Sequence, residues 1–324
     1  MSLAPSGYAT TFKVATISPE GSMWMEKMRE GAKEVAQKTD KRVKFKFYPG
    51  GVMGKDKPVL RKIRAGQLHG AAMVAGSLSS FFPANQIYAQ PMKFKSQKEV
   101  DYVRSHMDSF IIQGMEDAGL VTFGLSGGGF AYIMSKKPIK AIADLKKRKV
   151  WVPDNDKLSQ DVVGIFGVSP IPLGLPDVRT GLQSGLIDTV GTSPIGAIVL
   201  QWHTQIKYIT NLSLLYLHAA LFIDKKAFKR ISAPDQIIVR KIMGKAFKEI
   251  DDQNREDDLK AIAALKKQGI QFITPGKADL EEWLETAGKA SQGMVSSGVL
   301  PKEAADQLDA LLDEYRRTNG QDDK

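Results

Sequence analysis

The stretch FKVATISPEGSMWMEKMREGAKEVAQK, residues 12–38, decides the fold. Its first five residues alternate weakly as a strand does, a Pro-Gly turn follows, and residues 23–38 carry apolar side chains at helical spacing. The next segment, 43–48, alternates Val43, Phe45 and Phe47 with lysines, which predicts a strand with one buried face. The chain therefore opens as strand, loop, helix and strand, the order from which parallel sheets are built.

The same rhythm continues and then repeats. We expect a helix over 56–65, strands over 71–75, 120–125 and 132–134, and a crossover at the glycine run between the last two. A second series has strands over 149–152, 169–172 and 187–191, with a helix over 177–184. This alternation predicts an α/β protein of two similar halves, each a mostly parallel sheet flanked by helices.

A long helix is expected near the C-terminal third of the chain. Between Pro234 and Gln268 the only glycine is Gly244, and apolar residues recur every three or four positions. At 1.5 Å per residue such a helix spans about 50 Å, more than one small domain. We place domain I at 1–128 plus 217–256, and domain II at 129–216 plus 257–324.

Composition narrows the function classes. A chain of 324 residues exceeds the size of a single core, and the absence of cysteine excludes disulfides and thiolate metal sites. The net charge of +10 is spread among acids without an aromatic-interleaved basic module, so we expect no nucleic-acid partner. Histidines and acids lack metal-ligand spacing, and we predict neither metal nor cofactor.

Two further features concern location. No apolar stretch approaches the roughly 18 residues of a membrane span. Met1 to Gly7 lack the apolar stretch of a signal peptide, and we expect that a signal peptide has been removed.

One catalytic pattern is present. Gly124-Leu125-Ser126-Gly127-Gly128 fits the G-x-S-x-G motif, and Asp188 and His218 follow in the order that serine hydrolases use. That motif needs a helix after the serine, whereas residues 129–132 lead into another strand. A serine hydrolase is therefore the alternative function.

Several motifs, in this order, resemble the DctP-type substrate-binding proteins of tripartite ATP-independent periplasmic (TRAP) transporters. The resemblance covers about residues 12–311. Its marks are Pro19-Glu20-Gly21-Ser22-Met23-Trp24, Pro49-Gly50-Gly51-Val52-Met53-Gly54, Ser135-Lys136-Lys137-Pro138-Ile139, Val150-Trp151-Val152-Pro153 and Gly181-Leu182-Gln183-Ser184-Gly185-Leu186-Ile187-Asp188.

The resemblance implies a periplasmic receptor without catalytic activity. It implies a two-domain periplasmic-binding-protein-like fold, whose domains close on a small-molecule ligand in the cleft between them. The receptor then hands this ligand to a small and a large integral membrane subunit. We expect a monomer. Carried over position by position, the ligand-binding candidates are Glu20, Ser22, Met23, Trp24, Gly76, Ser77, Phe130, Ala131, Trp151, Leu175, Ser193, Tyr216 and His218.

The departures from the family pattern are informative. Typical members have an arginine at Trp151 that holds the ligand carboxylate, and often an asparagine at Ser193; sialic-acid-type members have a second arginine at Ala131. Losing the two hydrogen bonds that such an arginine gives a carboxylate removes about 3 to 6 kcal/mol of binding free energy. The affinity for the carboxylate then falls roughly a hundredfold to ten-thousandfold. Either Lys149 or Arg179 could restore a positive charge as an anion contact.

Trp151 itself has two interpretations. A tryptophan on an apolar strand face is more often part of a core than of a site, because its large area dominates packing. As a site residue it offers ring faces and one N–H donor. We therefore expect a ligand that is neutral, cationic or apolar, and no simple mono- or dicarboxylate, in an aromatic-lined cleft.

Overall fold

The computed structural model describes residues 9–154 and 156–319, and the N-terminal residues on which the signal-peptide prediction rests lie outside this part. The chain divides into two compact units. Unit 1 comprises Met1–Met73, Ile112–Ser126 and Ala219–Gln253, and unit 2 comprises Val74–Ile111, Gly127–His218 and Asn254–Lys324.

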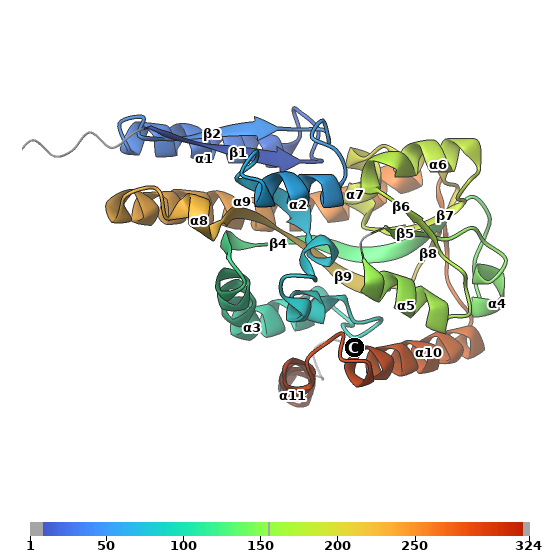
Figure 1. The fold of residues 1–324 in the computed structure, drawn as a ribbon. Helices are drawn as coiled ribbons and strands as arrows, with labels where there is room; N and C mark the ends of the chain where they lie inside the picture. Colours follow the sequence, from blue (N-terminus) through green and yellow to red (C-terminus); the bar gives the residue numbers. More distant parts are fainter. Residues whose placement is uncertain (1–8, 155, 320–324) are drawn as a thin grey trace, which may run out of the picture. The chain divides into compact units, whose positions relative to one another are not determined.

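Unit 1 begins with the predicted order of strand, helix and strand (Figure 1). Its first elements are β1 (Thr10–Thr16), α1 (Met23–Lys38), β2 (Val43–Tyr48), α2 (Asp56–Arg64) and β3 (Gly70–Val74), and α8 (Lys225–Phe228) follows later. β1 pairs in parallel with both β2 and β3. The predicted bounds of α1 and β2 are confirmed to the residue.

The core of unit 1 lies between these strands and helices. Phe12 and Val14 of β1 are fully buried together with Met28 of α1. A Cβ atom on Gly31 would lie 3.1 Å from the sulfur of Met243 and 3.2 Å from Cβ of Ala246. Glycine at this position therefore lets two helices approach closely.

Unit 2 contains a mixed sheet and a smaller parallel one. Its strands are β5 (Trp151–Pro153), β6 (Ile171–Leu173), β7 (Thr189–Thr192), β8 (Tyr208–Thr210) and β10 (Gln271–Ile273). β7 and β8 pair antiparallel to β4 (Leu120–Ser135), β10 pairs in parallel with β8, and β5 and β6 form a separate parallel pair. The α/β class is confirmed, but the larger sheet of unit 2 is not mostly parallel.

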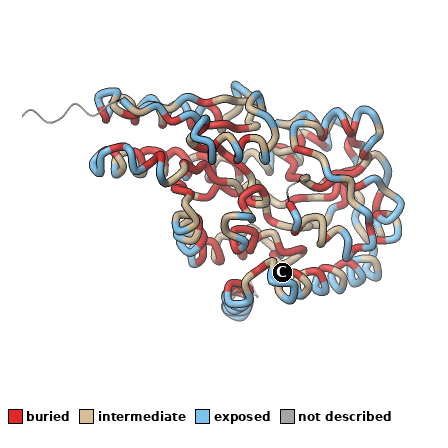
Figure 2. Tube along the Cα trace, viewed as in Figure 1, coloured by how far each residue is buried: buried red, intermediate tan, exposed pale blue. Residues whose placement is uncertain are grey.

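The helices of unit 2 are shorter except near the C-terminus. They are η1 (Ala75–Leu78), η2 (Pro83–Ala89), α4 (Ile142–Leu145), α5 (Lys157–Ile165), η3 (Leu175–Asp177), α6 (Val178–Ser184), α7 (Pro194–Val199), η4 (Trp202–Gln205), α10 (Lys277–Ser296) and α11 (Lys302–Asn319). Figure 2 shows exposed and buried positions alternating along α10 and α11, as expected for amphipathic helices. No described helix has the length and apolarity needed to cross a membrane.

Five elements continue from one unit into the other: β3, by its last residue Val74, and α3 (Gln97–Asp117), β4, β9 (Leu215–Asp224) and α9 (Ala233–Lys267). The 35 residues of α9 confirm the predicted long helix. The predicted break between two strands at the glycine run is wrong, because β4 is one strand of 16 residues. Its glycines allow close strand pairing, since a Cβ on Gly128 would lie 3.1 Å from Cβ of Leu217.

The segment 74–111, which the predicted boundaries assign to domain I, groups with unit 2. Hydrogen bonds to distant parts of unit 2 explain this. His218 lies 3.2 Å from Asn85, and Arg316 of α11 bonds both carboxylate oxygens of Glu99, at 2.7 and 3.0 Å.

Candidate functional site

Trp151, where the motif resemblance predicts an arginine in typical members, is almost entirely buried in unit 2. It is 6% exposed and packs edge-to-face on Trp202, with ring centroids 5.2 Å apart. The indole Nε1–H is the only hydrogen-bond donor of this side chain, and it donates to the carbonyl oxygen of Leu173 at 3.0 Å. The indole can therefore offer a ligand apolar surface only.

The two side chains predicted as possible anion contacts, Lys149 and Arg179, are both exposed. Lys149 precedes β5, and its Nζ donates to the carbonyl of Gly185 at 2.9 Å. Arg179 lies in the first turn of α6. The structure gives neither side chain the burial that would strengthen a charged contact with a ligand.

The first loop of unit 1 is held by local interactions. Glu20 accepts two hydrogen bonds from Arg29, at 2.9 and 2.6 Å, and these hold the pKa of Glu20 below its usual range. Ser22 caps α1 by accepting from the backbone N–H of Met25 at 3.4 Å. Met23 and Trp24 are half-buried and pack against the core of unit 1.

The turn at Gly76 and Ser77 in η1 lies against a buried carboxylate. A Cβ on Gly76 would be only 2.4 Å from Oδ2 of Asp156, which leaves room for glycine alone. Asp156 caps α5, accepting from the backbone N–H and hydroxyl of Ser159 at 3.1 and 2.6 Å, and from Gln86 at 2.9 Å. These three hydrogen bonds all come from residues of unit 2.

Ser193 and Leu175 begin two helical segments of unit 2. Ser193 is buried and caps α7 by accepting from the backbone N–H of Gly196 at 3.3 Å. Leu175 opens η3 and packs, half-buried, on the core cluster that contains Trp151.

A second carboxylate lies beside α7. Asp258 of α9 accepts a hydrogen bond from the backbone N–H of Ile195 at 3.1 Å. A Cβ on Gly129 would lie 2.9 Å from the carboxylate, and φ of Gly129 is +81°, a conformation that favours glycine. Burial raises the pKa of Asp258 to about 6.

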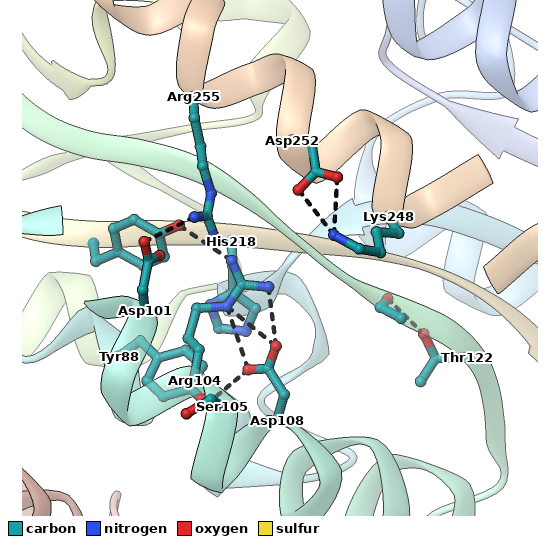
Figure 3. A network of polar contacts seen from close by, with 12 residues as sticks. Tyr88, Asp101, Arg104, Ser105, Asp108, Thr122, His218, Lys248, Asp252 and Arg255 are labelled. Atoms are coloured by element: carbon teal, nitrogen blue, oxygen red, sulfur yellow. Dashed lines mark hydrogen bonds and ion pairs between the residues drawn. The ribbon is translucent and has the colours of Figure 1, made fainter. Parts of the chain in front are cut away.

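Tyr216 and His218 are both buried on β9, and Figure 3 shows His218 close to the polar network of Arg104, Asp108 and Tyr88. Arg104 of α3 bonds Asp108 through Nε and Nη2, at 3.1 and 2.9 Å, and Tyr88 donates to the same carboxylate at 2.8 Å. The Nη1 atom of Arg104 lies 3.4 Å from the hydroxyl of Tyr216. The buried arginine is thus neutralised within unit 2.

Phe130 and Ala131 belong to β4. The ring of Phe130 packs edge-to-face on Tyr216, with centroids 5.5 Å apart. Ala131 is buried, and its carbonyl accepts from the backbone N–H of Leu214 at 2.8 Å. Phe130, Tyr216 and His218 therefore form one aromatic-rich neighbourhood, and their contacts with a ligand stay predictions.

The polar partners of these residues were not predicted from the sequence. Asn85, Gln86, Arg104, Asp156 and Asp258 all contact the predicted site positions or their neighbours. The one available signal was Asp156, an acidic residue immediately before an apolar-periodic segment, which is typical of a helix N-cap.

The hydrolase alternative finds no support in the geometry. Ser126 lies inside β4 and is fully buried, whereas a nucleophile elbow presents its serine at an exposed turn between strand and helix. Among residues 9–154 and 156–319, no group of three histidine, aspartate or glutamate side chains could hold a metal ion.

Comparison with known proteins gives a consistent result. The family model described as bacterial extracellular solute-binding protein, family 7 (DctP), matches residues 14–297. The sialic acid-binding periplasmic protein SiaP of Vibrio cholerae is 21% identical over 92% of this chain and 93% of its own length. The C4-dicarboxylate-binding periplasmic protein DctP of Rhodobacter capsulatus is 22% identical over 73% and 72%.

Solved structures share the fold. A TRAP periplasmic solute-binding protein from Xanthobacter autotrophicus, solved with bound β-D-galacturonate, has a TM-score of 0.84 at 19% identity, covering 93% of this chain and 99% of that one. The sugar acid-binding protein DctPAm from Advenella mimigardefordensis, in complex with galactonate, has a TM-score of 0.86 at 16% identity, covering 95% and 99%.

Proposed function

Because the chain belongs to the bacterial extracellular solute-binding proteins of family 7, we propose that it captures a solute other than a simple mono- or dicarboxylate for a TRAP transporter. Proteins of this family are periplasmic receptors and not enzymes, and they pass small molecules to integral membrane subunits. The proposed solute is neutral, cationic or apolar.

The observation that carries the proposal is the state of Trp151. An arginine at this position could give a carboxylate two charge-assisted hydrogen bonds, contributing about 3 to 6 kcal/mol. The indole offers neither charge nor a free donor, because its Nε1–H is bonded to Leu173. Binding of a small carboxylate at this strand is therefore weakened by roughly a hundredfold or more.

The exposed state of Lys149 and Arg179 supports the same conclusion. Surface charges interact with ligands in a high dielectric and contribute little. Arg104, which is buried, is matched by Asp108. The competing ligand class is a sugar acid, since several solved relatives hold one.

Calorimetry against a panel of small carboxylates, sugar acids, alcohols and amines tests the proposal. We expect no carboxylate of the panel to bind with submicromolar affinity. Submicromolar binding of galacturonate or a C4-dicarboxylate would contradict the proposed ligand class without affecting the membership of the family. Mass spectrometry of the solute carried through purification gives an independent identification.

Two variants sharpen the test. Trp151→Arg should gain carboxylate affinity, at a cost in stability because it buries a charge next to Trp202. Trp151→Phe keeps a ring and removes the N–H, and should leave carboxylate affinity unchanged. A Trp151→Arg protein that folds, as judged by circular dichroism, but gains no affinity for any carboxylate would argue against the clamp position.

A further inference from the structure

The imidazole of His218 holds a buried atom without a hydrogen-bond partner. His218 is 3% exposed, and its Nδ1 has no partner among the residues that the structure describes. An unsatisfied buried polar atom is unfavourable, and the large majority of such atoms in folded proteins have a partner. A bound group that donates a hydrogen bond to Nδ1 would remove this unfavourable state.

The other ring nitrogen fixes the tautomer of His218. The side-chain Nδ2 of Asn85 donates to the carbonyl of Ala75 at 3.0 Å, so the amide oxygen of Asn85 faces away from that carbonyl. This oxygen lies 3.2 Å from Nε2 of His218. Since an amide oxygen only accepts, Nε2 must carry the hydrogen. The proton of neutral His218 is thus held at Nε2.

The ring stays neutral over the physiological range. Burial lowers the pKa of His218 to about 3, and the nearby charge of Arg104 acts in the same direction. A neutral ring with its hydrogen at Nε2 presents a lone pair at Nδ1. Nδ1 is therefore an acceptor and cannot donate.

Aromatic side chains lie on and near this imidazole. Tyr88 packs edge-to-face on the imidazole with centroids 5.3 Å apart. Tyr216 lies two residues earlier on the same strand and contacts Phe130. Side chains two positions apart in a strand share a face. The imidazole is thus buried beside aromatic side chains, and burial strengthens a hydrogen bond made by its acceptor.

We infer that Nδ1 of His218 is the specificity acceptor for the solute, and that the solute presents an O–H or N–H donor to it. This inference rests on the proposed function and narrows it. An alcohol, phenol, amide or ammonium group fits. An ionised carboxylate has no hydrogen to donate and would set its charge against the lone pair.

Nitrogen-15 NMR of the histidine rings tests the inference on the unmodified protein. We expect His218 to show a hydrogen on Nε2 and a bare Nδ1 before addition of a probe. Benzyl alcohol or benzylamine should move the Nδ1 resonance, whereas toluene, which has no donor, should not. A hydrogen at Nδ1, or an Nδ1 resonance that neither donor probe moves, overturns the inference. An Nδ1 held permanently by water would give that second result.

A pair of variants adds an affinity measurement. In His218→Gln the amide nitrogen can occupy the place of Nε2 and keep the bond to Asn85, while the acceptor at Nδ1 is lost. We expect benzyl alcohol affinity to fall roughly tenfold, with toluene affinity unchanged. His203→Gln is the matched control, because His203 bonds the carbonyl of Ala197 away from this network. Equal loss for both probes overturns the inference.

The two proposals fail separately. Submicromolar binding of a plain carboxylate would contradict the proposed ligand class whatever the tautomer of His218. A solute class confirmed as neutral or cationic, together with an Nδ1 resonance that neither donor probe moves, would leave the receptor function intact and refute the role of His218.

Discussion

Asp258 is a carboxylate whose environment disfavours its charge. Burial raises its pKa from 3.8 to about 6, and one backbone N–H offsets this only in part. Well below pH 3.8 the carboxyl of Asp258 is protonated in both the folded and the unfolded state, so its titration makes no difference to the stability of the fold. As the pH rises to 6, the unfolded state loses its proton first, so the stability of the fold falls by about 3 kcal/mol.

Asp258→Asn should remove this pH dependence. The amide oxygen can still accept from Ile195, but the side chain cannot ionise. We expect the unfolding free energy of the variant relative to the wild type to increase between pH 4 and pH 7, by up to about 3 kcal/mol. Denaturant unfolding at a series of pH values measures it. Glu256→Gln, an exposed neighbour on the same helix, should show almost no effect. A difference for Asp258→Asn that is independent of pH would contradict the assignment.

Trp151 shows how one residue can satisfy both sequence interpretations. It packs in the core of unit 2 as tryptophans on apolar strand faces commonly do. It also stands where the motif resemblance predicts a charged anchor in typical members, and its N–H is bonded to the carbonyl of Leu173. The same packing that stabilises unit 2 removes the polar function, so a core role and an effect on ligand choice are compatible.

At the scale of elements, Gly76 of η1 is constrained by the cap of α5. Gly76→Ala would place a methyl group 2.4 Å from Oδ2 of Asp156 and force this carboxylate to move. Losing the cap and the bond to Gln86 should lower the unfolding free energy by about 1 to 3 kcal/mol. Denaturant midpoints measure the change.

A matched glycine provides the control for this prediction. Gly288 lies within α10, and no atom lies within 4 Å of a Cβ built on it. Gly288→Ala should therefore raise stability by about 0.5 to 1 kcal/mol, because alanine loses less conformational freedom in a helix. If both substitutions changed stability in the same direction, the steric explanation for Gly76 would be wrong.

Elements with local signals could be predicted from the sequence. α1 begins after a serine cap and β2 alternates strictly, so both were bounded to the residue. β4 was predicted as two strands because glycines usually mark turns, and only its pairing partner β9 reveals that close approach is their role. The alternation of strands and helices in the sequence likewise predicts parallel pairing, whereas β7 pairs antiparallel with β4.

The polar neighbours of the candidate site could not be predicted for a related reason. Gln86 and Asp156 are 70 residues apart, and Asn85 and His218 are 133 apart. No local sequence pattern links such pairs. The motif resemblance identifies candidate ligand-binding residues but not the residues that form hydrogen bonds with them. That Nδ1 of His218 has no hydrogen-bond partner among the described residues can be seen only from the three-dimensional surroundings of both ring nitrogens.

At the scale of the whole molecule, continuous elements connect the two units through the chain itself. The boundaries between the units fall inside β3, α3, β4, β9 and α9, so each boundary interrupts a regular run of backbone hydrogen bonds. Unfolding one unit alone would fray these elements in the other. Proteins with two domains often unfold in separate steps, but here we expect one cooperative transition.

Asp252 offers a test of this cooperativity, since it lies next to the boundary in α9 and its side chain is 57% exposed. Asp252→Pro removes a helical hydrogen bond and clashes with the preceding turn, which should destabilise the protein by about 3 kcal/mol or more. Calorimetry should give equal van't Hoff and calorimetric enthalpies for the wild type and a lower van't Hoff value for the variant. Asp252→Ala should remain two-state. A wild type that melts in two resolved steps would show that the shared elements do not couple the units.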